Sequence, residues 1–118
     1  MKANELMIGD WVRCTDPKPF RIEQIDGVEE QVYGDDGFFV DTADLQPIPL
    51  TGEILEKNGF KYNDLPMFQY FEQWGLQLYR GGNGFRINCG INVSLIIDSV
   101  HQLQHALKLC GIEKEITI

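Results

Sequence analysis

Short apolar runs separated by turn-forming residues make up the first third of the chain. Residues 20–24 alternate apolar and polar side chains, as a half-buried strand does. Further strands are expected over residues 6–14, 31–33, 38–40 and 44–48. Strands this short and this evenly spaced predict a small, strongly bent sheet or SH3-like barrel over residues 1–48.

The hydrophobic period then changes and predicts a two-turn helix that begins after Thr51. The Thr51 hydroxyl can accept a hydrogen bond from the first turn, and Leu50 and Leu55 have the spacing of a hydrophobic staple. Gly59 is placed for a left-handed C-terminal cap, with Phe60 packing back. A helix this short is not stable alone, so it must dock on a sheet.

The next block predicts a four-stranded antiparallel meander. Its strands are expected over residues 67–72, 76–79, 85–89 and 91–95. Residues 73–75 form a turn, and Gly81–Gly84 have the composition of a hairpin loop. One side of this sheet is apolar and therefore needs a cover.

A C-terminal helix is expected to supply this cover. Ser99 and Gln102 have the spacing of a capping box at its start, and Gly111 ends it. Five residues fall within one stripe at helical spacing: Val100, Leu103, Ala106, Leu107 and Cys110. Residues 116–118 are a candidate for a short edge strand.

These elements predict an α+β fold in two parts. Residues 1–48 form the small bent β lobe, and residues 49–118 form a lobe with a short helix, the meander and the covering helix. With 118 residues in total, the two lobes are expected to pack as one compact unit.

The net charge narrows the classes of partner. The chain has 18 acidic and 10 basic residues, a formal charge of −8, which opposes binding to nucleic acid and to anionic membranes. It has no apolar run of the roughly 18 residues that a membrane span needs, and its start does not resemble a signal peptide. A cytoplasmic protein is expected.

The three cysteines, Cys14, Cys89 and Cys110, lie far apart in the sequence. An odd number at such spacing predicts neither a disulfide framework nor a metal knuckle. We expect three small, mostly buried hydrophobic side chains in a reducing compartment.

His101 and His105 are spaced like two metal ligands on one helix. They lack the glutamate of the H-E-x-x-H motif and would need a third ligand from elsewhere. By helical angle they lie opposite the apolar stripe, so we expect them on a solvated or interface surface. In an interface, Gln102 and Gln104 would be further polar anchors.

Two other segments resemble binding loops only loosely. Gly81–Gly84 lack the lysine and the serine or threonine of a phosphate-binding loop. Asp35–Gly37, followed by Asp41 and Asp44, do not match a calcium-binding loop. We therefore expect no cofactor and no metal.

Charge segregation is the most unusual feature of the sequence. Residues 22–56 contain ten acids and no lysine or arginine. The candidate surface in this stretch comprises six acids: Glu29, Glu30, Asp35, Asp36, Asp41 and Asp44. They are either a solvated surface or a face that meets a basic partner protein or imitates nucleic acid.

The aromatic residues suggest a second surface. Trp11, Phe20, Phe38 and Phe39 are expected to fill the core of the first lobe. In the second lobe, five aromatic residues on adjacent strand positions cannot all point inward: Phe68, Tyr70, Phe71, Trp74 and Tyr79. Those that face outward would mark an interface if they are contiguous.

Three segments carry a resemblance to a known family. They are residues 5–12 (L-x-I-G-N/D-x-V), 46–60 (PIPLT … L-x-x-x-GF) and 100–104 (VHQLQ). They resemble a group of small proteins from Bacteroides-type gut bacteria and their phages and mobile elements. In that family the last helix tends to continue with an aromatic pair and to end in TGEEL, whereas here it continues as HALKLCGIEKE. The family has no assigned activity, so the resemblance implies a source and no catalytic residues.

The sequence therefore predicts a non-catalytic binding module that acts on an unidentified protein partner. The alternative is a nucleic-acid-binding accessory protein, with Lys57, Lys61, Arg80 and Arg86 along one face of the second lobe. An enzyme is the third hypothesis and would need a deep pocket with a titratable group of shifted pKa. A homo-oligomer formed through the meander edge or the aromatic patch is also open.

Overall fold

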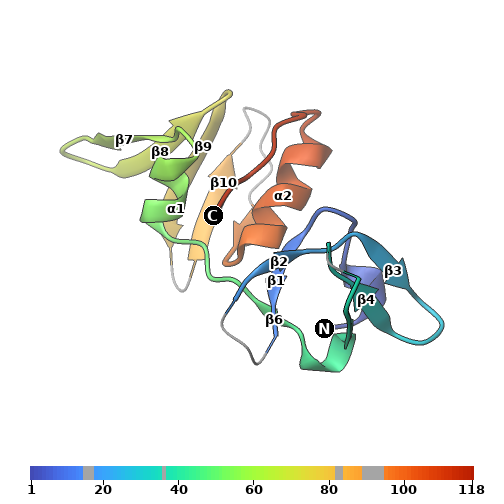
Figure 1. Ribbon diagram of the computed structural model, residues 1–118. Coiled ribbons are helices and arrows are strands. Elements are labelled where there is room, and N and C mark those ends of the chain that lie inside the picture. The colour runs from blue at the N-terminus through green and yellow to red at the C-terminus, as the bar shows by residue number, and fades with distance from the viewer. Residues whose placement is uncertain (15–17, 36, 82–83, 89–94) are drawn as a thin grey trace. The chain divides into compact units, whose positions relative to one another are not determined.

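The computed structural model describes residues 1–14, 18–35, 37–81, 84–88 and 95–118 (Figure 1). The described residues form antiparallel sheets and two α-helices, so the fold is α+β. The chain divides into two compact units, Met1–Ile48 (unit 1) and Pro49–Ile118 (unit 2). No helix in the described ranges is long and apolar enough to cross a membrane.

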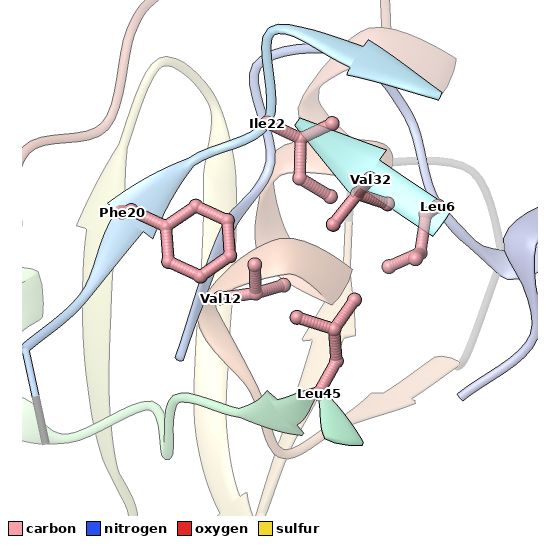
Figure 2. Close-up of a cluster of buried hydrophobic side chains, with 6 residues drawn as sticks. All are labelled: Leu6, Val12, Phe20, Ile22, Val32 and Leu45. Carbon is pink, nitrogen blue, oxygen red and sulfur yellow. The ribbon is translucent and has the colours of Figure 1, made fainter. Parts of the chain in front are cut away.

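Unit 1 consists of two small three-stranded sheets and two 3₁₀ helices. The first sheet has the order β2-β1-β6 and the second the order β3-β4-β5. The elements are η1 (Ala3–Glu5), β1 (Trp11–Arg13), β2 (Phe20–Arg21), β3 (Gln24–Asp26), β4 (Gln31–Tyr33), β5 (Phe39–Asp41), η2 (Thr42–Asp44) and β6 (Gln46–Pro47). Six side chains make up the core, as Figure 2 shows: Leu6, Val12, Phe20, Ile22, Val32 and Leu45.

Three expected strands of unit 1 are shorter than predicted. The strand predicted over residues 44–48 is reduced to β6, because Asp44 belongs to η2. The strand predicted over residues 6–14 pairs only at Trp11–Arg13, because the chain turns at Ile8–Gly9. The strand predicted over residues 20–24 is divided between the two sheets, and the buried Ile22 lies at the division. The backbone N–H of Ile22 donates to the carbonyl of Asp10 at 3.0 Å, which replaces a regular ladder contact there.

Unit 2 contains a five-stranded antiparallel meander of order β11-β10-β9-β8-β7. Its strands are β7 (Lys61–Asp64), β8 (Gln69–Gln73), β9 (Leu76–Gly81), β10 (Gly84–Asn88) and β11 (Leu95–Ile97). The prediction of four strands missed β7, whose residues are mostly polar. The tip of the predicted loop, residues 82–83, and most of the strand predicted over 91–95 lie outside the described residues.

The turn between β8 and β9 fixes how these two strands pair. Trp74 has φ 53° and Gly75 has φ 78°, so both central residues are left-handed. Two such residues define a type I′ hairpin turn, whose twist matches that of the strands it joins. Gln73 therefore pairs with Leu76, and Phe71 with Leu78.

The centre of the inner face of the meander is buried. Phe71, Leu78 and Ile87 lie side by side on β8, β9 and β10, and all three are buried. Two helices complete this interior, α1 (Gly52–Lys57) with Leu55 and α2 (Val100–Leu109) with Val100, Leu103, Ala106 and Leu107. The apolar stripe predicted for the last helix is thus confirmed, except for Cys110, which is exposed at the helix end.

The caps of α1 are as predicted, whereas that of α2 differs. Thr51 Oγ1 accepts from the backbone N–H of Ile54 at 3.3 Å, and Phe60 N–H donates to the Leu55 carbonyl beyond the left-handed Gly59. The capping box of α2 is wrong because Ser99 Oγ contacts His101 Nδ1 at 3.1 Å instead of capping the helix. Gln102 Oε1 accepts from the N–H of Asp98, one residue before the N-cap, at 2.7 Å, so neither half of the predicted box forms.

The Asn58 side chain holds the end of the C-terminal tail. The strand predicted over residues 116–118 is wrong, because these residues pair with no strand. Instead, Asn58 Nδ2 donates to the Thr117 carbonyl at 2.7 Å, and the Thr117 N–H donates to Asn58 Oδ1 at 2.8 Å. The Asn58 amide thus takes the place of a neighbouring strand and keeps Ile116 buried.

Replacing Asn58 by alanine is expected to release the tail. The Asn58→Ala variant loses three hydrogen bonds to Thr117 and one to the Ile54 carbonyl. Because those to Thr117 are exposed, we expect a decrease of about 1–2 kcal/mol in the free energy of unfolding. Amide hydrogen exchange at Thr117 should be faster in this variant than in the native chain under conditions in which the rest of the protein stays folded. The control is Asn63→Ala, since among the described residues the Asn63 side chain makes a single hydrogen bond, 3.4 Å long, to the Lys61 carbonyl of its own strand. Unchanged exchange at Thr117 in Asn58→Ala would contradict this role.

Candidate binding surface

The outer face of the meander carries a row of large side chains. Because side chains alternate along a strand, the residues next to the buried Phe71, Leu78 and Ile87 point to the opposite side. In register across four strands, this row is Tyr70, Tyr79, Arg86 and Ile96. Ile96 is 62% exposed, which is unusual for an isoleucine in a sheet.

Three aromatic rings contact one another on this face. Phe68 stacks on Tyr70 with ring centroids 5.7 Å apart, and Tyr79 lies 5.4 Å from Tyr70 and 6.2 Å from Phe68. Phe68 is 46% exposed, and the two tyrosines are half-buried. We call the set of Phe68, Tyr70, Tyr79, Arg86 and Ile96 the aromatic face. It fulfils the expectation that some aromatic residues of this lobe face outward.

Arg86 supplies the charge of the aromatic face. Its side chain is exposed and makes no hydrogen bond or ion pair to any residue that the structure describes. The other charges on this side of the sheet, Lys61 and Glu72, lie directly opposite each other on β7 and β8. Because their charges offset each other, Arg86 is the unbalanced cation among the strand residues of the outer face, and the exposed Asp98 lies just beyond the end of β11.

The basic residues do not form one face. Arg80 pairs with the buried Phe85 across the hairpin and places its guanidinium 5.8 Å from that ring, on the side opposite Arg86. Lys57 is exposed on α1. The hypothesis of a basic stripe that contains both Arg80 and Arg86 is therefore wrong, because their side chains point to opposite sides of the sheet.

Each unit also contains a surface cavity. The cavity of unit 1 has a volume of about 680 Å³, and Trp11, Phe38 and Arg21 are among its lining residues. The cavity of unit 2 has a volume of about 560 Å³ and lies between α1, with Glu53 and Glu56, and Arg80. Both cavities have walls of mixed charge.

The histidine pair is not on an open surface. His101 is buried, and its ring lies 5.7 Å from that of the half-buried His105. The prediction of a solvated face is wrong for His101, because the start of α2 is enclosed where Pro49 bridges to Ser99. The side-chain oxygen of Gln102 accepts a hydrogen bond from the backbone N–H of Asp98. In the described parts of the chain, no group of three or more histidine, cysteine, aspartate or glutamate side chains could hold a metal ion.

The acidic candidates divide into exposed and structural groups. Glu29, Asp35, Asp41 and Asp44 are exposed, whereas Asp36 lies outside the described residues. Glu30 is also exposed, but its Oε2 accepts from the Ala3 N–H at 2.8 Å and from Thr42 Oγ1 at 3.1 Å. Glu30 thus ties the start of the chain to η2.

The charges are distributed unevenly between the two units. Unit 1 carries 11 acids and 4 bases, a formal charge of −7, and unit 2 carries 7 acids and 6 bases, a charge of −1. The aromatic face therefore belongs to the nearly neutral unit.

Not all of the aromatic residues that were expected in the core of unit 1 are buried. Phe20 is buried, but Phe39 is 60% exposed and Phe38 lies at the surface against Phe20, with centroids 5.1 Å apart. Phe39 lies on β5, an edge strand of three residues, so its ring is covered from one side only.

The expectation that the cysteines are mostly buried is wrong for the two that the structure describes. Cys14 is half-buried and Cys110 is exposed, so neither is a core residue. Cys89 lies outside the described residues.

Sequence reasoning identified the aromatic residues of this surface but missed Ile96. Residues 95–97 are a continuous apolar run, so alternation could not show which of them points outward. Comparison with protein-family models, with curated proteins and with solved structures finds no match to this chain.

Proposed function

We propose that the protein is a non-catalytic binding module that acts on a protein partner through the aromatic face. The observation that carries the proposal is the cluster of three contacting, partly exposed rings on one side of the meander. Aromatic residues and arginine are enriched in protein interfaces, and lysine, glutamate and aspartate are depleted there. Phe68, Tyr70, Tyr79 and Arg86 match that composition.

The architecture of the sheet supports this role. A side chain on a strand is held by its neighbours on both sides, so it loses little conformational freedom when a partner binds. Tyr79 is further held by a hydrogen bond from its hydroxyl to Gln77 Oε1 at 2.8 Å. The aromatic face is therefore ordered before the partner arrives.

The wider setting follows from the family resemblance. The proposal places the protein in the cytoplasm of a host cell and in a phage or mobile-element context. It also treats unit 1 as an SH3-like lobe, supported by its two short-stranded antiparallel sheets around a core of six side chains. In this scheme the charge of unit 1 keeps the module soluble and repels acidic polymers.

Nucleic acid is the second candidate ligand. Bases can stack on exposed tyrosine and phenylalanine rings, and Arg86 could contact a phosphate. The formal charge of −8 and the single unbalanced cation of the outer face oppose this alternative. A protein partner is therefore the better-supported reading.

The proposal is tested by capture from a nuclease-treated host lysate. The native chain is expected to retain a stoichiometric protein. The Tyr70→Ser/Tyr79→Ser variant is expected to lose at least about 90% of it, because an aromatic hot spot at the centre of an interface contributes about 2 kcal/mol or more. A second variant, Arg86→Glu, changes only an exposed side chain and should also reduce capture. Circular dichroism and thermal unfolding would establish that both variants are folded.

A matched control changes the acidic surface instead. The variant Glu29→Gln/Asp35→Asn/Asp41→Asn/Asp44→Asn removes four exposed charges of unit 1 and leaves the aromatic face intact. It should retain the partner. Loss of the partner in this control, with retention in the tyrosine variant, would overturn the proposal and move the binding surface to unit 1.

A further inference from the structure

We infer that the occupant of the aromatic face is a short, extended peptide segment that places one carboxylate between two apolar side chains. This inference rests on the proposed function and specifies its partner. It follows from the size of the face, from the order of its side chains and from its single unbalanced charge.

The size of the face favours a segment over a folded surface. Five strands at a spacing of about 4.8 Å and about five residues at about 3.3 Å each give the outer face an area of about 400 Å². A second copy docked face to face would bury about 800 Å² in total, below the roughly 1,200 Å² at which specific, stable interfaces begin. An extended peptide of about seven residues would span the five strands.

The order of side chains predicts the pattern of the peptide. Across the strands, the row passes from the rings of Tyr70 and Tyr79 to Arg86 and then to Ile96. In an extended peptide, every second side chain points to the same side. The matching sequence is therefore apolar, any, acidic, any, apolar, and it is the same in both chain directions.

The charge of the face sets the number of acidic positions. Lys61 and Glu72 face each other, which leaves Arg86 as the cation available to a ligand carboxylate. A guanidinium binds a carboxylate through two parallel hydrogen bonds, which also fixes its orientation. A run of several acids would leave all but one carboxylate without a cation on the outer strands, since Lys61 already lies opposite Glu72. One carboxylate is thus preferred over an acidic tract or a nucleic-acid strand.

A selection from a random displayed peptide library tests this pattern. The full native chain is expected to enrich peptides with one aspartate or glutamate two positions from an apolar residue on each side. The same selection on Arg86→Glu should replace that acid with lysine or arginine. Selection on Tyr70→Ser/Tyr79→Ser should give no enrichment of the pattern.

The most specific test reverses the charge of residue 86 in the protein and of the acidic position in the peptide, and compares the binding affinities of all four combinations. A synthetic peptide from the native selection should bind Arg86→Glu at least about tenfold more weakly, because a charge contact becomes a repulsion. Its Asp→Lys version should bind Arg86→Glu better than the native chain. A variant that merely failed to fold could not show this reciprocal preference.

Other outcomes overturn the inference and separate it from the proposed function. If selection enriches no common pattern while lysate capture still depends on Tyr70 and Tyr79, the partner is a folded surface and only the inference fails. Enriched peptides that bind Arg86→Glu equally well would also exclude the carboxylate contact. If an oligothymidylate binds the native chain, but not Tyr70→Ser/Tyr79→Ser, the ligand is single-stranded nucleic acid and both proposals fail.

Discussion

Leu78→Ala is expected to lower the free energy of unfolding of unit 2 by about 3–4 kcal/mol, the range typical of a large-to-small change in a packed core. Leu78 has no exposed surface and lies between Phe71 and Ile87 on the middle strand of the meander. Its neighbours come from strands on both sides, so the surrounding side chains cannot collapse into the space that the substitution leaves.

Urea unfolding measured by tryptophan fluorescence and circular dichroism would provide this difference, and a matched control comes from α2. Leu109 is 79% exposed, so the chemically identical change Leu109→Ala should alter stability by less than about 0.5 kcal/mol. A small effect of Leu78→Ala would mean that the inner face is not the core of unit 2.

Gly84→Ala should be the second most disruptive change. A Cβ atom at Gly84 would overlap the backbone carbonyl oxygen of Ile97 on the neighbouring strand β11. Backbone atoms cannot move aside as a flexible side chain does, so the pairing of β10 with β11 would have to open. We expect a loss of about 2–3 kcal/mol, as for other overpacked sites.

Gly81 provides the control for Gly84. The two glycines are partners in the register of β9 and β10, but a Cβ at Gly81 would meet nothing within 4 Å. Gly81→Ala should therefore leave stability nearly unchanged or raise it slightly, since alanine reduces the freedom of the unfolded chain. Equal effects of the two substitutions on the midpoint of urea unfolding would argue against the close approach of β11 at Gly84.

Features set by neighbouring residues could be predicted from the sequence. The Thr51 cap, the end of α1 at Gly59 and the turn at Trp74–Gly75 depend on a few adjacent positions. The buried stripe of α2 was predictable for the same reason, since a helix repeats every 3.6 residues whatever its surroundings.

Features set by distant contacts could not be predicted. Lys61–Asp64 carry little strand preference, and they form β7 because β8 offers them a partner. Asn58 and Thr117 are 59 positions apart, so no local pattern could show that one holds the other. The division of residues 20–24 was hidden because the alternation of apolar and polar side chains continues through the bend.

The candidate surface was predictable in part. Strand alternation shows that Tyr70 and Phe71 must face opposite sides, but only the register of the strands brings Tyr70, Tyr79 and Arg86 into one row. For His101, helical angle alone was misleading, because the burial of a helix terminus depends on the chain that crosses it. The structural role of the Glu30 carboxylate could not be predicted either, because the residues that donate to it lie 27 and 12 positions away in the sequence.

The left-handed pair Trp74–Gly75 has a consequence for how this surface can evolve. One residue inserted into that turn would shift β8 against β9 by a single position. The shift would move every side chain of β8 to the opposite face of the sheet, so that Tyr70 would point to the interior and Phe71 to solvent. The protein would then lose both its core and its docking surface. The length of this turn is therefore constrained by both faces of the sheet, whereas each side chain is constrained by the one face on which it lies.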